Sequence, residues 1–141
     1  MLSAKDVMVS PAITVTPDET VEEVAHKFLD HHISGMPVVD PSGRLLGVVT
    51  ECALLDMVND PKLSRNVVSH YMTRDVVWVD VDQTLSEAVS QIVDHGIRRL
   101  PVTSEGHVVG IISRREIIRR ACEDLTRRNE HDWLRRLEAV V

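Results

Sequence analysis

The chain has 141 residues, of which 43% are hydrophobic and 27% charged, a composition typical of a soluble globular protein. The net charge of −6 argues against a nucleic-acid-binding protein, because such proteins need a basic surface to displace counterions. Apolar runs such as Leu45 to Val49 are too short to cross a bilayer, and the N-terminus carries no secretion signal. Two cysteines, Cys52 and Cys122, without metal-site spacing fit a reducing, cytoplasmic environment.

An internal repeat runs through the chain at an offset of 64 residues, which pairs segment 8–15 with segment 72–79. Identical residues then recur at Asp18, Thr20, Glu23, Asp30, His31, Ile33, Pro37 and Val38, which pair with positions 82, 84, 87, 94, 95, 97, 101 and 102. After a deletion of one residue the offset becomes 63, which pairs Gly43 and Gly47 with Gly106 and Gly110. The repeat predicts two copies of one small module.

The first half of each copy predicts a strand followed by a helix. The strands are expected at residues 13–15 and 76–79. Thr20 and Thr84 each precede a glutamate by three residues, which is the pattern of a capping box at a helix start. Apolar residues at helical spacing continue through residues 21–29 and 85–93.

The second half of each copy predicts a hairpin and another helix. Strands are expected at residues 36–39 and 45–50 in the first copy and at 100–103 and 108–113 in the second, each pair joined by a glycine turn. The second helices begin at Glu51 and Arg114. The predicted fold class is therefore α/β (α+β): two βαββα repeats, packed sheet to sheet in a pseudo-twofold arrangement over a shared core, with a C-terminal helical extension.

The expected boundaries are 1–58 for the first repeat, 59–66 for a linker marked by Asn59-Asp60-Pro61, 67–120 for the second repeat and 121–141 for a helical tail. The tail interleaves arginine pairs with acidic residues, which is typical of a charged helix face. We expect its helix to break near Asn129. Asp132 is then expected to cap a final helical segment with an apolar stripe, which comprises Trp133, Leu134, Leu137 and Val140. We expect this stripe to pack on the module or on a second subunit; the alternative is a binding surface for a client protein.

The repeated motifs resemble those of the cystathionine-β-synthase (CBS) domain. Both copies carry a His-x-Ile segment leading to Pro-Val, at His31 to Val38 and His95 to Val102, and then a glycine strand that ends in Thr50 or Ser113. Two such domains in tandem resemble a stand-alone CBS pair, or Bateman module. The resemblance implies a regulatory protein, commonly a homodimer, that binds AMP, ADP, ATP, NAD(H) or S-adenosylmethionine in two related clefts.

The resemblance also implies which residues form these clefts. The first combines both repeats and uses Ile13, Ile33, Ser34, Gly35, Arg98, Ser113, Arg115 and Glu116. The second uses Thr50, Cys52, Val76, Val77, Ile97 and Arg99. A hydroxyl and free N–H groups at a helix start suit a phosphate, and an acid three residues later suits the ribose hydroxyls.

The chain departs from the family pattern where the ribose-binding aspartate is expected. Glu116 stands there in the first cleft and Ala53 in the second, so we expect the first cleft to be the better site. Plain structural interpretations stay open: Arg98 and Arg99 as a solvated pair, Thr50 and Ser113 as helix caps, and Glu116 as a first-turn acid. A metal site is one interpretation of the group His26, Asp30, His31 and His32. A histidine near the C-terminal end of a helix, where the helix dipole favours it, is the simpler interpretation.

The main hypothesis is a non-catalytic module that binds an adenine nucleotide between its repeats and signals through a change in conformation. The alternative is a ligand-free dimeric scaffold that regulates a partner protein. The sequence shows no Ser-His-Asp order, no metal cluster and no phosphate loop, so we expect no enzyme activity. The negative net charge and the short apolar runs lead us to expect neither nucleic acid nor a membrane among its partners.

Overall fold

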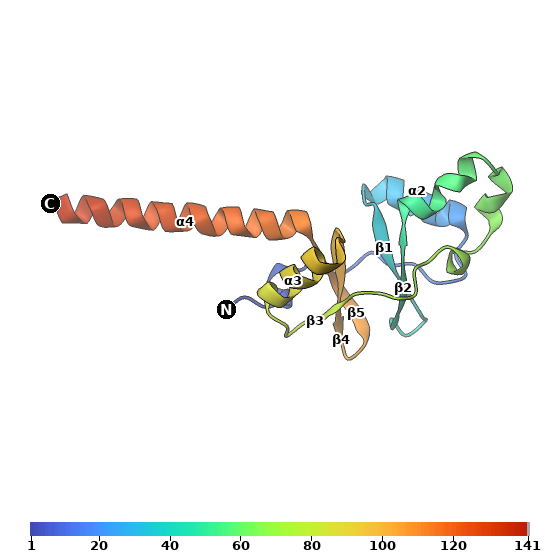
Figure 1. Cartoon of the computed structure of the whole chain (residues 1–141), viewed down its shortest axis with the longest axis horizontal. Coiled ribbons are helices and arrows are strands. Elements are labelled where there is room, and N and C mark those ends of the chain that lie inside the picture. The colour runs from blue at the N-terminus through green and yellow to red at the C-terminus, as the bar shows by residue number, and fades with distance from the viewer. Residues whose placement is uncertain (141) are drawn as a thin grey trace.

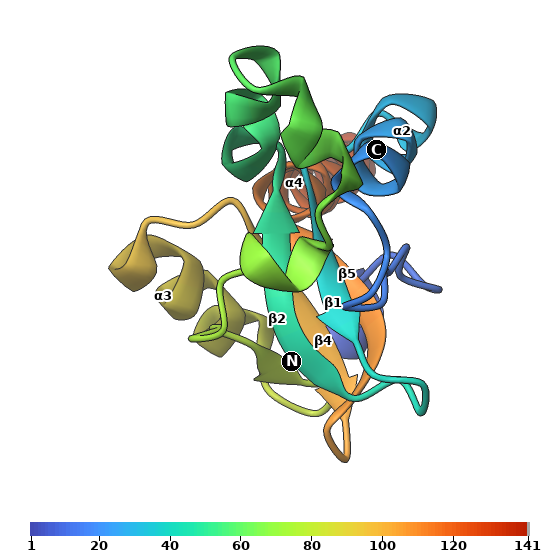
Figure 2. The same cartoon turned by 90° about the vertical axis from the view of Figure 1, so that its right-hand side faces the viewer.

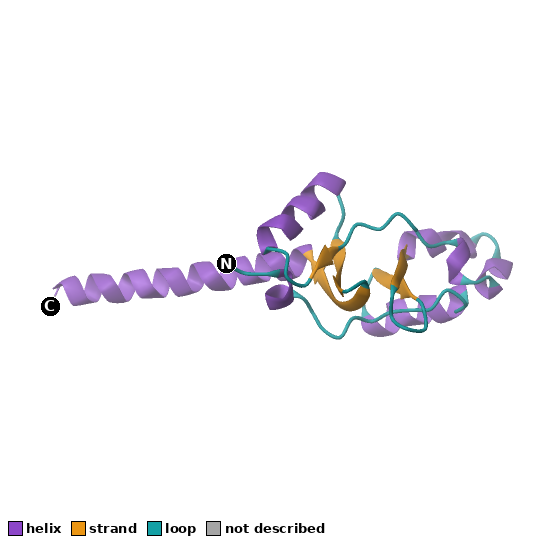
Figure 3. Cartoon of the chain, turned by 90° about the horizontal axis from the view of Figure 1, so that it is seen from below, coloured by secondary structure: helices purple, strands orange, loops and turns teal. Residues whose placement is uncertain are grey.

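The computed structural model describes the backbone of residues 1–140 and the side chains of residues 1–130 and 135. Two α/β repeats stand side by side, with their strands in the middle and their helices on the outer sides (Figure 3). A long C-terminal helix projects from the second repeat, away from the first (Figure 1). Among the described residues, no helix combines the length and apolar character needed to span a bilayer.

The first repeat pairs strands β1 (Gly35–Val39) and β2 (Leu45–Thr50) in an antiparallel hairpin, packed on helix α2 (Val21–His31). Helix α2 begins at Thr20 with the predicted capping box, in which the Thr20 hydroxyl accepts from the Glu23 N–H at 3.2 Å. The helix expected at Glu51 is a 3-10 helix, η1 (Glu51–Val58), and the linker contains another, η2 (Pro61–Arg65).

The second repeat orders its strands β3 (Val79–Asp80), β4 (Arg99–Ser104) and β5 (His107–Ser113), with β3 parallel to β4 and β5 antiparallel to it. Helix α3 (Leu85–His95) is capped by Thr84, as predicted. Only one of the two hydrogen bonds of the capping box forms, because the Glu87 carboxylate accepts a hydrogen bond from the Gln83 side chain. The predicted α/β pair of repeats is confirmed.

The first strand of each repeat is shorter than expected. In the first repeat a single parallel bridge joins Val15 to Val38, and in the second only β3 remains of the strand expected at 76–79. The chain turns immediately after Val15, where the Glu19 carboxylate accepts from the Thr16 N–H at 2.7 Å. The turn falls where the predicted strand ends, so the pairing that is missing is that of residues 13 and 14, and of residues 76–78 in the second repeat.

The segments that precede the repeats are exchanged between them. Helix α1 (Ala4–Val7) packs in the core of the second repeat, and Val9 exchanges two backbone hydrogen bonds with Ile111 of β5. In the same way 3-10 helix η3 (Val68–His70) packs in the core of the first repeat, and Thr73 exchanges two with Val48 of β2. Each repeat is completed by the chain that leads into the other.

The buried side chains form two clusters, one between each sheet and its own helix, and the single shared core we expected was wrong. Helices α2 and α3 cover the outer faces of the sheets and bury them. Strand β2 alternates between buried and half-buried positions only from Gly47 to Thr50, since Leu46 is exposed. The hairpins instead meet at their turns, where Leu45 N donates to Gly106 O and Val108 N donates to Gly43 O. The two sheets face each other in Figure 2.

Helix α4 (Arg114–Val140) is continuous, so the break expected near Asn129 was wrong. No glycine or proline interrupts these 27 residues, and ion pairs one turn apart support the first half, such as Arg120 with Asp124 at 3.5 Å. The side chains of the predicted stripe, Trp133, Leu134, Leu137 and Val140, lie outside the described residues.

Candidate functional site

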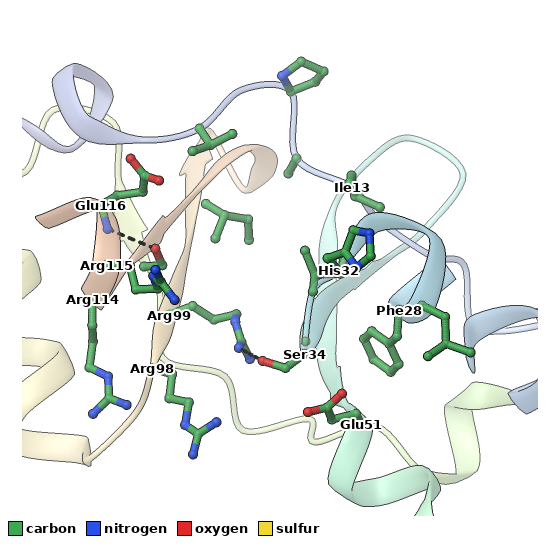
Figure 4. A pocket seen from close by; sticks show the side chains of 18 residues that line it. Ile13, Phe28, His32, Ser34, Glu51, Arg98, Arg99, Arg114, Arg115 and Glu116 are labelled. Carbon is green, nitrogen blue, oxygen red and sulfur yellow. Dashed lines mark hydrogen bonds between the residues drawn. The ribbon is translucent and has the colours of Figure 1, made fainter. Parts of the chain in front are cut away.

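A cleft of about 700 Å³ lies between the two repeats, within the size range of small-molecule sites. All eight residues predicted for the first cleft line it, and Figure 4 shows side chains from both repeats facing one another across it. The lining residues that the sequence analysis did not assign to it are Val9, Pro11, Ala12, Phe28, Leu29, His32, Glu51, Arg99, Ile111 and Arg114. The exchange of the N-terminal segment brings Val9, Pro11 and Ala12 here, and no local pattern revealed it.

The wall formed by the first repeat is largely apolar. It includes the ring of Phe28, which is almost fully buried, and the half-buried side chains of Ile13 and Ile33. Leu29 on helix α2 is 71% exposed at its rim. An apolar wall of this kind suits a flat aromatic group such as a nucleobase.

The start of helix α4 forms the opposite wall. The Ser113 hydroxyl accepts from the backbone N–H of Glu116 at 3.2 Å, the dashed line in Figure 4, so Ser113 caps the helix. The Glu116 carboxylate pairs with Arg119 on the same helix at 3.1 Å, and its side chain is 26% exposed. A ligand hydroxyl would therefore compete with Arg119 for this carboxylate.

Arg99 reaches into this cleft, although the sequence analysis had assigned it to the second. Its side chain leaves the start of β4, and Nη2 donates to the Ser34 hydroxyl of the first repeat (Figure 4). The guanidinium lies against Gly35, where an added Cβ would touch Nη1 and come within 2.9 Å of Cζ. Gly35 and Arg99 are equivalent in the repeat, so equivalent positions meet where the two copies face each other.

The cleft carries an excess of positive charge. Four arginines line it, at positions 98, 99, 114 and 115, against the two glutamates Glu51 and Glu116. Burial lowers the pKa of Arg99, and the adjacent Arg98 lowers it further while Glu51 acts in the opposite direction. The guanidinium nevertheless stays protonated at neutral pH, so Arg99 is a partly desolvated cation.

The residues predicted for the second cleft do not line one described hollow together. Val77 and Ile97 pack against the core of the second repeat, and Cys52 is exposed. Val76 lines a separate hollow of about 320 Å³ beside Trp78, and Thr50 makes no side-chain capping bond. Since Arg99 lines the first cleft and Val76 this separate hollow, each of the three described hollows contains at most one of these six residues.

No cluster of three histidine, cysteine, aspartate or glutamate side chains suited to a metal ion occurs within the searched part of the chain. His31 and His95 end helices α2 and α3, which is the position expected for them.

Comparison with known protein families identifies the same domain in both repeats of the chain. The model of the CBS domain matches the chain twice, over residues 4–60 and 68–123. Protein MJ1225 of Methanocaldococcus jannaschii is 30% identical over 115 residues, which cover 82% of this chain and 41% of that protein. Inosine-5′-monophosphate dehydrogenase of the same archaeon is 34% identical over 118 residues, which cover 83% of this chain and 23% of the enzyme. The chain thus spans less than half of either relative.

Solved structures match over nearly their full length. The AcuB protein of Vibrio cholerae has a TM-score of 0.83 at 26% identity and covers 92% of this chain and 97% of its own. CBSX2 in complex with AMP has a TM-score of 0.77 at 27% identity, covering 87% and 98%. The CBS domain pair of MJ0100, in complex with 5′-methylthioadenosine and S-adenosyl-L-methionine, has a TM-score of 0.78 at 25% identity, covering 88% and 98%.

Proposed function

The chain belongs to the CBS domain family, with two repeats, and from that premise we propose that it is a non-catalytic regulatory module. It binds an adenine nucleotide or nucleoside in the cleft between the repeats, from the group of AMP, ADP, ATP, NAD(H) and S-adenosylmethionine. The observation that carries the proposal is the cleft of about 700 Å³ lined by all eight residues predicted from the sequence.

The lining matches the parts of such a ligand. The apolar wall beside Phe28 and Ile13 accommodates the adenine ring, and Glu116 offers a carboxylate to the ribose hydroxyls. Solved CBS pairs of similar fold hold AMP or S-adenosylmethionine, which supports an adenine-containing ligand for this chain. Because the cleft draws on both repeats, a bound ligand stabilises one arrangement of the repeats over others, and a partner protein that contacts both repeats can sense this change.

A thermal-shift and calorimetric titration with the five ligands tests this proposal. A ligand present at 100 times its dissociation constant stabilises the folded chain by about 2.7 kcal/mol, a readily measured shift. Replacing Glu116 by alanine removes one charged hydrogen bond, worth roughly 1.5–3 kcal/mol, and should weaken binding about ten- to a hundredfold. Glu123→Ala is the matched control, since Glu123 is exposed on the same helix and outside the cleft lining.

Absence of a shift with every ligand would contradict the proposal. It would favour the second candidate function, a ligand-free dimeric scaffold that regulates a partner protein. The observation favouring that candidate is the state of the two acid positions: the Glu116 carboxylate is already paired with Arg119, and Ala53 offers no carboxylate. Light scattering would then measure the oligomer on which that function depends.

A further inference from the structure

We propose that the chain has a further ligand site, for a small aromatic carboxylate, in a hollow at the hairpin turns. This turn hollow has a volume of about 320 Å³, and its lining includes Arg44, Leu46, Arg74, Trp78 and Thr103. Its volume is less than half that of the first cleft, so it suits a ligand smaller than a nucleotide. The proposal goes beyond the proposed function and does not depend on it.

The turn hollow and the first cleft lie toward opposite ends of the hairpins. The two hairpin turns meet at the turn hollow, where Leu45 N donates to Gly106 O at 3.2 Å and both residues line it. The first cleft instead reaches Glu51 and Arg114, which follow the other ends of β2 and β5. Of the six residues predicted for the second cleft, only Val76 lines the turn hollow. The turn hollow is therefore lined by a different set of residues from either predicted cleft.

Two arginines line the turn hollow, and neither forms an ion pair among the described residues. Arg44 lies against the facing hairpin turn, since a Cβ added at Gly106 would come within 3.2 Å of its Nη1. The Arg74 guanidinium donates a long hydrogen bond to a backbone oxygen, at 3.5 Å. The one carboxylate in the lining, that of Asp40, already accepts from Ser42 and from the backbone N–H of Arg44. The turn hollow thus has an excess of positive charge, and a ligand carboxylate matches the planar fork of a guanidinium.

Trp78 indicates the aromatic part of the ligand. Its indole lines the turn hollow and is 49% exposed, and Leu46, which also lines it, is 37% exposed. Large apolar side chains exposed together at a hollow are typical of a surface that a ligand covers. An aromatic ring stacked on the indole removes this surface from water.

A buried hydroxyl supplies a third polar group. Thr103 is only 2% exposed and lines the turn hollow. Within the part of the chain that the structure describes, its hydroxyl takes part in no hydrogen bond. Buried polar groups are nearly always hydrogen-bonded, so this hydroxyl indicates a partner that enters the hollow. A carboxylate oxygen accepts such a hydrogen bond.

These features belong to one side of the pair only. The four side chains that carry the site differ from their equivalents in the repeat: Arg44, Arg74, Trp78 and Thr103 pair with His107, Ser10, Thr14 and Val39. The Ser10 hydroxyl instead donates to the backbone oxygen of Val109 at 2.8 Å. The same fold thus forms around smaller or apolar residues at these positions, so it does not itself require two arginines and an indole there.

An NMR titration of the full chain with benzoate tests this proposal. Benzoate should shift the indole N–H signal of Trp78 in a saturable way at concentrations up to about 10 mM, since a ligand of this size is expected to bind with a millimolar dissociation constant. Trp78→Thr identifies that signal by its loss, and it introduces the residue that the other repeat carries. Benzamide lacks the charge and acetate lacks the ring, so each should bind at least about tenfold more weakly than benzoate.

Three variants test the polar groups of the turn hollow. Arg44→Gln and Arg74→Gln should each weaken benzoate binding about tenfold or more, because each removes a charged hydrogen bond. Thr103→Val, which introduces the residue of the other repeat, should weaken it about two- to tenfold. Arg65→Gln is the matched control, since it removes the same charge from an exposed position outside the three described hollows and should leave the affinity unchanged. Thermal unfolding confirms that each variant is folded.

Absence of a saturable shift, or equal affinity for benzoate and benzamide, would overturn the proposal. So would a response that survives both Arg44→Gln and Arg74→Gln. If Arg99→Gln weakens the response as much as Arg44→Gln does, benzoate acts from the first cleft and the proposal is wrong. None of these results concerns an adenine ligand, so failure of this site is distinguishable from failure of the proposed function.

Discussion

The two exchanged segments predict a difference between two equivalent glycines. Gly110 in β5 and Gly47 in β2 each face a methionine from the segment that completes the repeat. A Cβ added at Gly110 would lie 2.6 Å from the Sδ of Met8, and the backbone oxygen of Val9 comes next after this side chain at 3.0 Å. A Cβ added at Gly47 would lie 2.7 Å from the backbone oxygen of Thr73, and Met72 comes second at 3.0 Å.

Each glycine-to-alanine substitution should therefore destabilise the chain by about 1–3 kcal/mol, the usual cost of overpacking. A second substitution, of the methionine that faces each glycine, should affect the two glycine variants differently. Met8→Ala removes the closest obstacle at Gly110, so the double variant should be more stable than the sum of the singles by about 1 kcal/mol or more. Met72→Ala leaves the Thr73 oxygen in place, which also accepts from Val48 N at 2.9 Å, so that pair should be additive within about 0.5 kcal/mol.

Urea unfolding followed by circular dichroism measures the free energy of unfolding for all six variants, and an unchanged m-value confirms that the same transition is compared. The chain provides its own control, since the two pairs occupy equivalent positions in the repeat. Equal coupling in the two pairs, or stronger coupling for Gly47 with Met72, would show that the exchanged segments do not pack as described.

Two further predictions concern acid stability and the second cleft. The Asp40 carboxylate accepts from the Ser42 hydroxyl and from the backbone N–H groups of Arg44 and Ser42, which holds its pKa below the ordinary value. The ionised carboxylate therefore stabilises the folded chain above the ordinary pKa, and this stabilisation is lost as the pH falls below about 4. The free energy of unfolding of Asp40→Asn should depend less on pH in that range than that of the wild type. An unchanged dependence on pH would contradict this. Ala53→Asp should raise the ligand stoichiometry measured by titration from about one to two per chain, and an unchanged stoichiometry would show that the missing acid is not what limits the second cleft.

Local signals in the sequence were sufficient for most of the elements. Thr20 and Thr84 cap their helices as predicted, because a capping bond joins residues only three positions apart. The glycine turns and the hairpins they join were confirmed for the same reason. The first strands were overestimated: of residues 13–15 only Val15 forms a bridge, and of residues 76–79 only Val79 lies in β3.

The site needed information that no local window contains. The family pattern identified residues of the first cleft because each belongs to a recurring motif, and the structure brings all eight together. The same family pattern placed Arg99 in the second cleft, whereas its side chain lines the first. Its actual direction depends on the residue facing it from the other copy, which is a glycine. The exchange of residues 1–10 between repeats was equally hidden, because those residues contact a strand about a hundred positions away.

The equivalence of Gly35 and Arg99 explains why one cleft differs from the other. In a perfect repeat, positions 35 and 99 would carry the same residue. Two arginines at this point would repel each other. Two glycines would leave it without a cation. One glycine and one arginine allow a single guanidinium to cross to the first repeat and contact Ser34. The first cleft thus holds an arginine that was predicted for the second, and the two acid positions differ as well, with Glu116 in the first and Ala53 predicted for the second. Both differences set the first cleft apart from the second, in the direction that the proposed function requires.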